Sequence, residues 1–284
     1  MRKRSAKIHT SEFTDFCFGV KRAISLAESA LERCPSPVFS LGSLIHNRQV
    51  VTGLSKKGLR VVNDLSKVRG GTLVIRSHGI MPNILRSIDK KVHCVDATCP
   101  FVKNAQHIAG DLFRRGYAVI IVGDKGHPEV KALKHYAGTT GIIVSSRSEI
   151  KNLSFAKRKV GVIAQTTQSQ QNFRDIVSEL LKKDFTEVRI YSTICKDANM
   201  RQESARRCSR ISDLVIVIGG KNSANTKRLY DICKGMGTCA RHIETAKEIK
   251  RRWLTRKKTI GVVSGASTPK WIVDDVIRHL RLMT

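Results

Sequence analysis

The stretch that decides the fold is Val95–Val102, with the sequence VDATCPFV, about one third of the way along the chain. It opens at the end of a short apolar run that is typical of a buried strand. Asp96 and Thr98 suit the cap of a following helix, and Pro100 suits its first turn. Cys99 is therefore predicted at the N-terminus of a helix, where the helix dipole favours a thiolate over a thiol. Such a sulfur is placed to react or to bind a metal.

The same arrangement occurs at two other cysteines. Cys17 precedes a helical pattern that begins near Val20, and Cys195 follows the apolar segment Val188–Ile190 and precedes a long helical pattern. A second polar loop follows each cysteine after 28 or 29 residues, and a third follows after 61 to 72 residues. The second loops carry His46, His127 with Glu129, and Ser223 to Asn225, and the third loops carry His78, Thr166 and Ser267.

These spacings predict an α/β fold made of three similar modules with mainly parallel sheets, because strands alternate with helical patterns throughout. We place the modules at residues 1–98, 99–194 and 195–284, the last with a C-terminal tail. In parallel sheets the functional loops lie beyond the carboxyl ends of the strands. If the modules pack around a pseudo-threefold axis, all nine polar loops point at one central cavity.

Composition limits the classes of protein to consider. No apolar run approaches the roughly 20 residues of a membrane helix, and the basic start lacks the apolar core of a secretory signal. Eight scattered cysteines do not suggest a disulfide scaffold, so a reducing cytoplasm is expected. The net charge is +29, from 52 Lys and Arg against 23 Asp and Glu. The basic runs, such as residues 1–4 and 157–159, lack interleaved aromatic residues, which argues against a base-stacking surface.

The polar set indicates a particular chemistry. Three thiolates 82 and 96 residues apart do not have the local spacing of a zinc site, but they suit an iron–sulfur cluster bound across modules. A [4Fe–4S] cluster with three cysteines keeps one iron open to a substrate oxygen. The surrounding His, Ser, Thr and Asn side chains suit phosphate oxygens, and Glu129 could deliver a proton. The sequence therefore favours reduction of a small phosphorylated molecule.

Nine motifs, in order along the chain, are similar to those of the LytB-type 4-hydroxy-3-methylbut-2-enyl diphosphate reductases. They are CFGVKRAI from Cys17, IHN from Ile45, SHG from Ser77, DATCP from Asp96, GHPE from Gly126, QTT from Gln165, RQE from Arg201, KNS from Lys221 and GAS from Gly265. The resemblance covers residues 17–277.

The resemblance implies reductive dehydroxylation of the allylic alcohol diphosphate, in the last step of the non-mevalonate isoprenoid route, to isopentenyl and dimethylallyl diphosphates. It implies one [4Fe–4S] cluster per subunit and ferredoxin or flavodoxin as electron donor. Because one chain supplies every proposed site group, a monomer would suffice. The resemblance also implies roles for residues. Cys17, Cys99 and Cys195 would ligate the cluster. Thr166 and Glu129 would lie beside the substrate hydroxyl, with Glu129 feeding protons. The diphosphate would be held by His46, His78, His127, Ser223, Asn225 and Ser267.

Two positions depart from the family pattern. Asp15 stands where a glycine is usual, and Ala224 stands where a serine is common in the loop around Ser223. The alanine removes one hydroxyl donor, so weaker diphosphate binding is expected. Two alternatives from other classes stay open, a non-catalytic iron–sulfur redox sensor and a basic nucleic-acid-associated protein. Neither alternative requires Glu129 for its activity.

Overall fold

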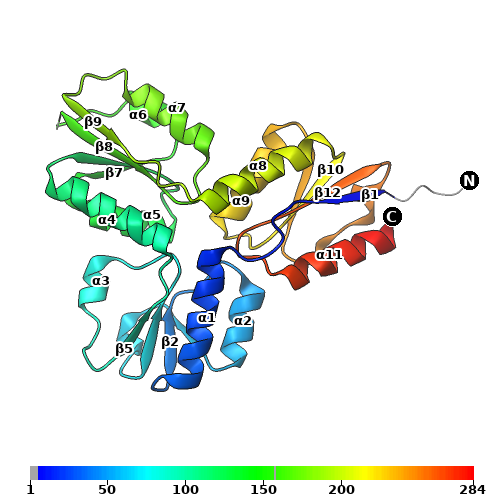
Figure 1. Cartoon of the computed structure of the whole chain (residues 1–284), viewed down its shortest axis with the longest axis horizontal. Helices are drawn as coiled ribbons and strands as arrows, with labels where there is room; N and C mark the ends of the chain where they lie inside the picture. The colour runs from blue at the N-terminus through cyan, green and yellow to red at the C-terminus, as the bar shows by residue number, and fades with distance from the viewer. Residues whose placement is uncertain (1–5, 157) are drawn as a thin grey trace, which may run out of the picture. The chain divides into compact units, whose positions relative to one another are not determined.

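The computed structural model describes residues 6–156 and 158–284, so the basic run at residues 1–4 and Lys157 lie outside the described residues. The chain forms two compact units. The first runs up to Phe18, includes His46–Arg48 and resumes with Lys196–Thr284, and the second holds Gly19–Ile45 and Gln49–Cys195. Three four-stranded sheets form the framework (Figure 1), and all strand pairs of the described residues are parallel. The predicted α/β class is confirmed.

The first sheet lies in the second unit and has the strand order β3-β2-β4-β5. Its strands are β2 (Val38–Leu41), β3 (Arg60–Val62), β4 (Thr72–Ile75) and β5 (His93–Asp96). The helices of this part of the chain are α1 (Phe18–Arg33), α2 (Arg48–Lys56), the 3-10 turn η1 (Leu65–Lys67) and α3 (Pro82–Arg86). Its core is small and centres on Phe39 and Leu73.

The second sheet, also in the second unit, has the order β7-β6-β8-β9. It consists of β6 (Ala118–Val122), β7 (Gly141–Val144), β8 (Lys159–Ala164) and β9 (Glu187–Ile190). The helices are α4 (Pro100–Arg114), α5 (Pro128–Tyr136), η2 (Gly138–Thr140), α6 (Arg147–Lys151) and α7 (Gln170–Leu180). Successive side chains of a strand face opposite sides, so Ile120 packs with α7 residues and Ile121 with α4 and α5 residues.

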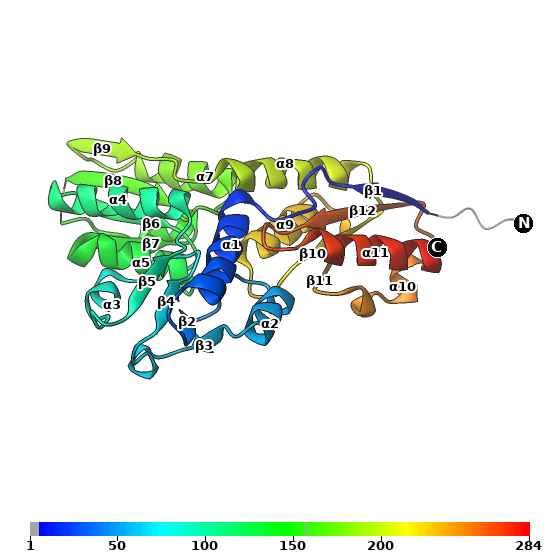
Figure 2. The same cartoon turned by 60° about the horizontal axis from the view of Figure 1, so that its bottom comes forward.

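The third sheet lies in the first unit and has the order β1-β12-β10-β11. Its strands are β1 (Lys7–Thr10), β10 (Leu214–Ile218), β11 (Cys239–Ile243) and β12 (Thr259–Ser264). The helices are α8 (Lys196–Arg210), α9 (Ala224–Gly235), η3 (Ala246–Glu248), α10 (Arg251–Leu254) and α11 (Lys270–Met283). One apolar layer joins this sheet to α11 and the other joins it to α8 and α9, so helices cover both faces (Figure 2).

The three sheets share one connection pattern. In each sheet the first strand of the pattern (β2, β6 or β10) lies between the next two strands in sequence. The fourth strand (β5, β9 or β1) pairs with the second of these two and forms the edge of the sheet. The fourth strand of the third sheet is β1, since Lys7 pairs with Thr259 and Thr10 with Val262. The predicted module of residues 1–98 includes β1, whereas the structure pairs that strand with the end of the chain.

Each sheet has one further edge strand, opposite the strand that leads to a cysteine. The additional strands are β3, β7 and β11, each hydrogen-bonded to only one neighbour. No helix of the described residues is both long and apolar enough to span a membrane.

Candidate functional site

The three predicted ligand cysteines occupy equivalent places in the fold. Cys17 lies between β1 and α1, Cys99 between β5 and α4, and Cys195 between β9 and α8. Each therefore follows the outermost strand of its sheet, at the carboxyl end, and directly precedes a helix. All three are half-buried and form no disulfide among the described residues. The three sulfurs thus follow equivalent edge strands in three sheets with the same strand connections.

A backbone hydrogen bond fixes each of these cysteines against a neighbouring polar loop of the same sheet. The N–H of each cysteine donates to a carbonyl in the third polar loop of another repeat: the preceding repeat for Cys99 and Cys195, and the last repeat for Cys17. The pairs are Cys17 with Ala266 at 3.0 Å, Cys99 with Ser77 at 3.0 Å, and Cys195 with Thr166 at 2.9 Å. Each cysteine is therefore held beside a loop that carries Ser267, His78 or Thr166. These bonds form because adjacent parallel strands end at the same edge of a sheet.

Cys99 is the N-cap residue of α4, and Pro100 takes the first helical position as predicted. The expected capping by Asp96 is wrong, because the Asp96 carboxylate accepts from the Thr98 N–H at 2.9 Å and so closes a turn before the helix. Burial raises the pKa of the Cys99 thiol, and the helix N–H groups of Phe101 and Val102 offset this only in part. In the metal-free chain desolvation therefore outweighs the helix terminus, contrary to the preference for a thiolate expected from sequence.

Space for the Cys99 sulfur comes from Gly19, two residues after Cys17. A Cβ on Gly19 would lie 2.6 Å from Cys99 Sγ, well inside van der Waals contact. The missing side chain at Gly19 thus leaves the space that the Cys99 sulfur occupies. Three cysteines at equivalent places in the fold fit the ligand set of an iron–sulfur cluster held by three thiolates.

Glu129 is buried, with 1% of its surface exposed, in the first turn of α5. Its carboxylate accepts two hydrogen bonds from Thr166, one from the backbone N–H at 2.6 Å and one from the hydroxyl at 2.9 Å. Burial raises the pKa of Glu129 to about 7. The two hydrogen bonds from Thr166 lower this pKa but do not offset the effect of burial. A carboxyl with this pKa can carry and release a proton near neutral pH. The predicted proximity of Glu129 and Thr166 is thus observed.

Two of the predicted histidines lie together in the second unit. The rings of His78 and His127 meet edge to face with centroids 5.5 Å apart. His127 is the N-cap of α5, and its Nδ1 accepts from the Glu129 N–H at 3.3 Å. This bond leaves Nε2 of His127 as the nitrogen that can carry a proton and face a ligand. The pair is therefore joined to Glu129 through the first turn of α5.

The first unit holds the other predicted polar residues. Ser223 is the N-cap of α9, and its hydroxyl accepts from the Thr226 N–H at 3.3 Å. Ala224 begins the helix. Asn225 is 4% exposed, and neither its amide nitrogen nor its amide oxygen has a hydrogen-bond partner among the described residues. Buried polar atoms are normally paired, so this side chain indicates a place for a polar ligand.

The hydroxyl of Ser267 donates to the carbonyl of His46 at 3.1 Å, which brings two further predicted residues together within the first unit. Sequence reasoning missed Thr226, which is fully buried and whose hydroxyl has no partner among the described residues. Its position one residue after Asn225, in the first turn of α9, was the available signal. Backbone N–H groups at the start of a helix of this length also favour an anion.

Comparisons with known proteins agree with this picture. The profile of the LytB protein family matches residues 8–281. A protein of Pelobacter propionicus named 4-hydroxy-3-methylbut-2-enyl diphosphate reductase is 44% identical over 266 residues, 93% of this chain and 94% of its own. One of Geobacter metallireducens with the same name is 44% identical over 267 residues, 94% of each chain.

Two solved structures are similar over nearly the whole chain. The first is described as the E-1-hydroxy-2-methyl-but-2-enyl-4-diphosphate reductase from Plasmodium falciparum. It has a TM-score of 0.92 and 28% identity, and the match covers 96% of this chain and 87% of that one. The second is described as (E)-4-hydroxy-3-methyl-but-2-enyl diphosphate reductase, the terminal enzyme of the non-mevalonate pathway. It has a TM-score of 0.69 and 39% identity, with coverage of 98% and 99%.

Proposed function

The chain belongs to the LytB family, and from that membership and the site residues we propose that it reduces (E)-4-hydroxy-3-methylbut-2-enyl diphosphate. The products are isopentenyl diphosphate and dimethylallyl diphosphate. Two electrons and two protons enter, the allylic C–O bond breaks, and the hydroxyl leaves as water. The observation that carries the proposal is the buried Glu129–Thr166 pair on the loop that also bonds Cys195.

Cys17, Cys99 and Cys195 would hold one [4Fe–4S] cluster per chain. When bound, such a cluster supplies electrons and one iron with an open coordination position that can act as a Lewis acid. The support is chemical and local, because three cysteines that form no disulfide among the described residues occupy equivalent positions, and Gly19 leaves room for the sulfur of one of them. We retain the pseudo-threefold arrangement around a central cavity, and the predicted modules, as part of this proposal, since the sheets share one strand order.

The diphosphate would bind to side chains that donate hydrogen bonds. His46, His78, His127, Ser223, Asn225 and Ser267 fill this role, with the unpartnered Asn225 amide as the strongest local support. Ala224 stands among these residues and offers only its backbone N–H at the start of α9. Binding is therefore expected to rely on the neighbouring side chains and on the helix terminus.

Glu129 would act as the proton donor. Its pKa of about 7 keeps a substantial fraction of the carboxyl groups protonated at neutral pH. The hydroxyl of Thr166 donates a hydrogen bond to the carboxylate and can orient it toward the substrate hydroxyl. Closing the site against water would strengthen these contacts, because electrostatic interactions grow in a low dielectric.

The electron donor in this proposal is ferredoxin or flavodoxin, and the net charge of +29 favours such acidic partners over neutral ones. We further propose a monomer in the cytoplasm, since one chain contains every proposed site residue.

Iron and sulfide analysis after anaerobic purification tests the cluster. We expect about four irons per chain, and a clear loss of iron in each of the three variants Cys17→Ser, Cys99→Ser and Cys195→Ser. Cys34→Ser is the matched control, because Cys34 is also a half-buried free thiol but has no proposed role. Retention of all iron by the three variants would contradict the ligand assignment.

Glu129→Gln separates the enzyme from the redox-sensor and nucleic-acid alternatives. The glutamine keeps the size of the side chain but cannot supply a proton, so turnover should fall by roughly 10²-fold or more while iron content stays unchanged. Full turnover in this variant would show that the proton comes from another group. If the wild-type chain binds a full complement of iron but shows no turnover, the redox-sensor alternative is favoured.

A further inference from the structure

Arg201 is a buried arginine whose motif has no place in the proposed chemistry. It lies in the middle of α8, and 3% of its side chain is exposed. Charged groups are seldom buried to this degree unless they are paired. The contacts of its guanidinium group therefore indicate what the residue is for.

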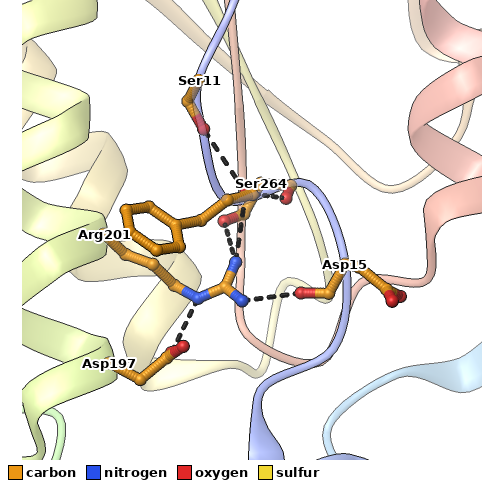
Figure 3. A network of polar contacts seen from close by, with 6 residues as sticks. Ser11, Asp15, Asp197, Arg201 and Ser264 are labelled. Carbon is orange, nitrogen blue, oxygen red and sulfur yellow. Dashed lines mark hydrogen bonds and ion pairs between the residues drawn. The ribbon is translucent and has the colours of Figure 1, made fainter.

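The guanidinium contacts four acceptors, all of them within the first unit (Figure 3). Nε donates to the Asp197 carboxylate at 2.7 Å, in the first turn of the same helix. Nη2 donates to the carbonyl of Asp15 at 2.6 Å. Nη1 lies 3.2 Å from the carbonyl of Phe13 and 3.3 Å from the carbonyl of Ser264. Only one of these four acceptors is a side chain.

The carbonyls belong to two segments that meet at Cys17. Residues 11–17 form no helix or strand, so their backbone groups need partners from elsewhere. Arg201 supplies two of these partners, and the Ser264 hydroxyl adds a bond to the Phe13 carbonyl at 2.9 Å. The second segment begins at Ser264, the last residue of β12, and includes Ala266, which accepts the hydrogen bond from the Cys17 N–H. The guanidinium thus bonds both segments two residues before each of them reaches the Cys17–Ala266 bond.

We propose that Arg201 is a positioning residue that fixes the Cys17 loop in the orientation its sulfur needs to bind the cluster. This inference rests on the proposed ligand role of Cys17. Because α8 begins directly after Cys195, the helix that carries Arg201 also starts at another proposed ligand. The Asp197–Arg201 pair therefore connects the start of α8 with the Cys17 loop.

The geometry requires arginine rather than lysine. The planar guanidinium has five N–H donors that point in different directions, and here they reach three carbonyls and a carboxylate. A lysine ammonium is a single point with three donors and cannot span these acceptors. The contact with Asp15 uses its backbone carbonyl, so the departure from glycine at that position leaves the clamp intact.

Alkylation of individual cysteines in the metal-free, full-length chain tests this role without relying on activity. We compare Arg201→Gln with Arg207→Gln, since Arg207 lies on the same helix and bonds Glu12 of the same segment through an exposed pair at 3.1 Å. Peptide mass spectrometry follows the rates at Cys17 and Cys99. In R201Q the Cys17 rate should rise by roughly tenfold or more, as expected for loss of a charge-assisted bond. In R207Q, and at Cys99 in both variants, we expect little change.

Three results would overturn the proposal. They are an unchanged Cys17 rate in folded R201Q, an equal rise at Cys17 and Cys99, and an equal rise in R207Q. If R201Q does not fold, the same alkylation experiment on Asp197→Asn tests the proposal, because this substitution removes the ion pair but leaves the carbonyl contacts of Arg201 available. A rise confined to Cys17 in D197N supports the proposal, and no rise contradicts it.

Iron retention links the loop to the cluster. Reconstituted R201Q should lose iron to a chelator several times faster than R207Q, and Arg201→Lys should not restore the wild-type rate. Faster alkylation at Cys17 with unchanged iron retention would overturn the link to the cluster. A wild-type chain that binds no iron would instead show that the proposed function has failed.

Discussion

Gly19→Ala adds a single methyl group at a point where the structure has no room for it. Gly19 is the second residue of α1 and has no positive φ, so the backbone accepts alanine. The new Cβ would lie 2.6 Å from Cys99 Sγ and 3.2 Å from Cys99 Cβ. Since ordinary contacts are about 3.5–4.0 Å, the sulfur must move by roughly 1 Å. Cys99 cannot move freely, because its N–H is bonded to Ser77 and it caps α4.

Gly53→Ala is the matched control for this substitution. Gly53 lies inside α2, and a Cβ there meets nothing within 4 Å. Its replacement should stabilise the metal-free chain by about 1 kcal/mol through helix propensity. Overpacking costs about 1–3 kcal/mol, so G19A should be less stable than G53A by about that amount. Denaturant unfolding of both metal-free variants measures the difference.

The larger effect of G19A should be on iron binding. Metal–ligand distances tolerate only about 0.2 Å, so a sulfur displaced by roughly 1 Å should leave less than about half of the iron bound. G53A should bind as much iron as the wild type. The reasoning is refuted if G19A is stabilised like G53A and keeps its full iron content.

Three further substitutions test the chemistry of the site. The raised pKa of Glu129 gives a contribution to folding stability that is fully present below about pH 4.5 and is lost as the pH rises through 7. Over that range the free energy of unfolding of the wild type should fall by about 3 kcal/mol relative to that of Glu129→Gln. Unfolding of the two metal-free chains at each pH measures the difference. Thr166→Val removes a hydroxyl bond that lowers the pKa of Glu129, so the alkaline fall of kcat/KM should move to higher pH; a move to lower pH would contradict this. Ala224→Ser restores a hydroxyl at the start of α9 and should tighten binding of the diphosphate by roughly tenfold, whereas unchanged binding would show that residue 224 does not face it.

Strands that are buried on both faces were the most predictable part of the fold. The apolar runs Ala118–Val122 and Leu214–Ile218 are strands with those same bounds, because a central strand between two helical layers needs apolar side chains throughout. The edge strand Arg60–Val62 gave no such signal, as two of its three residues are exposed. The pairing of β1 with β12 also lacks a local signal, since it joins the two ends of the chain.

The site residues were predictable by type but not by environment. The repeat places Cys99 after its strand, where the structure has it, whereas Glu129, predicted on a loop, lies in the first turn of α5. The raised pKa of the Cys99 thiol depends on burial by neighbours that are distant in sequence, and a helix-terminus argument does not include that desolvation. The contacts of Arg201 could not be predicted from the types of the residues around it either, because three of its four acceptors are backbone carbonyls.

The most direct test of the central claim is oxidation of a reduced viologen dye by the anaerobically prepared chain when the allylic diphosphate is added. The proposed reaction consumes two electrons per substrate, so about two equivalents of one-electron dye should be oxidised for each molecule converted. Dye oxidation should stop when the diphosphate is exhausted. A chain that contains about four irons but oxidises no dye on addition of the diphosphate would contradict the proposed function.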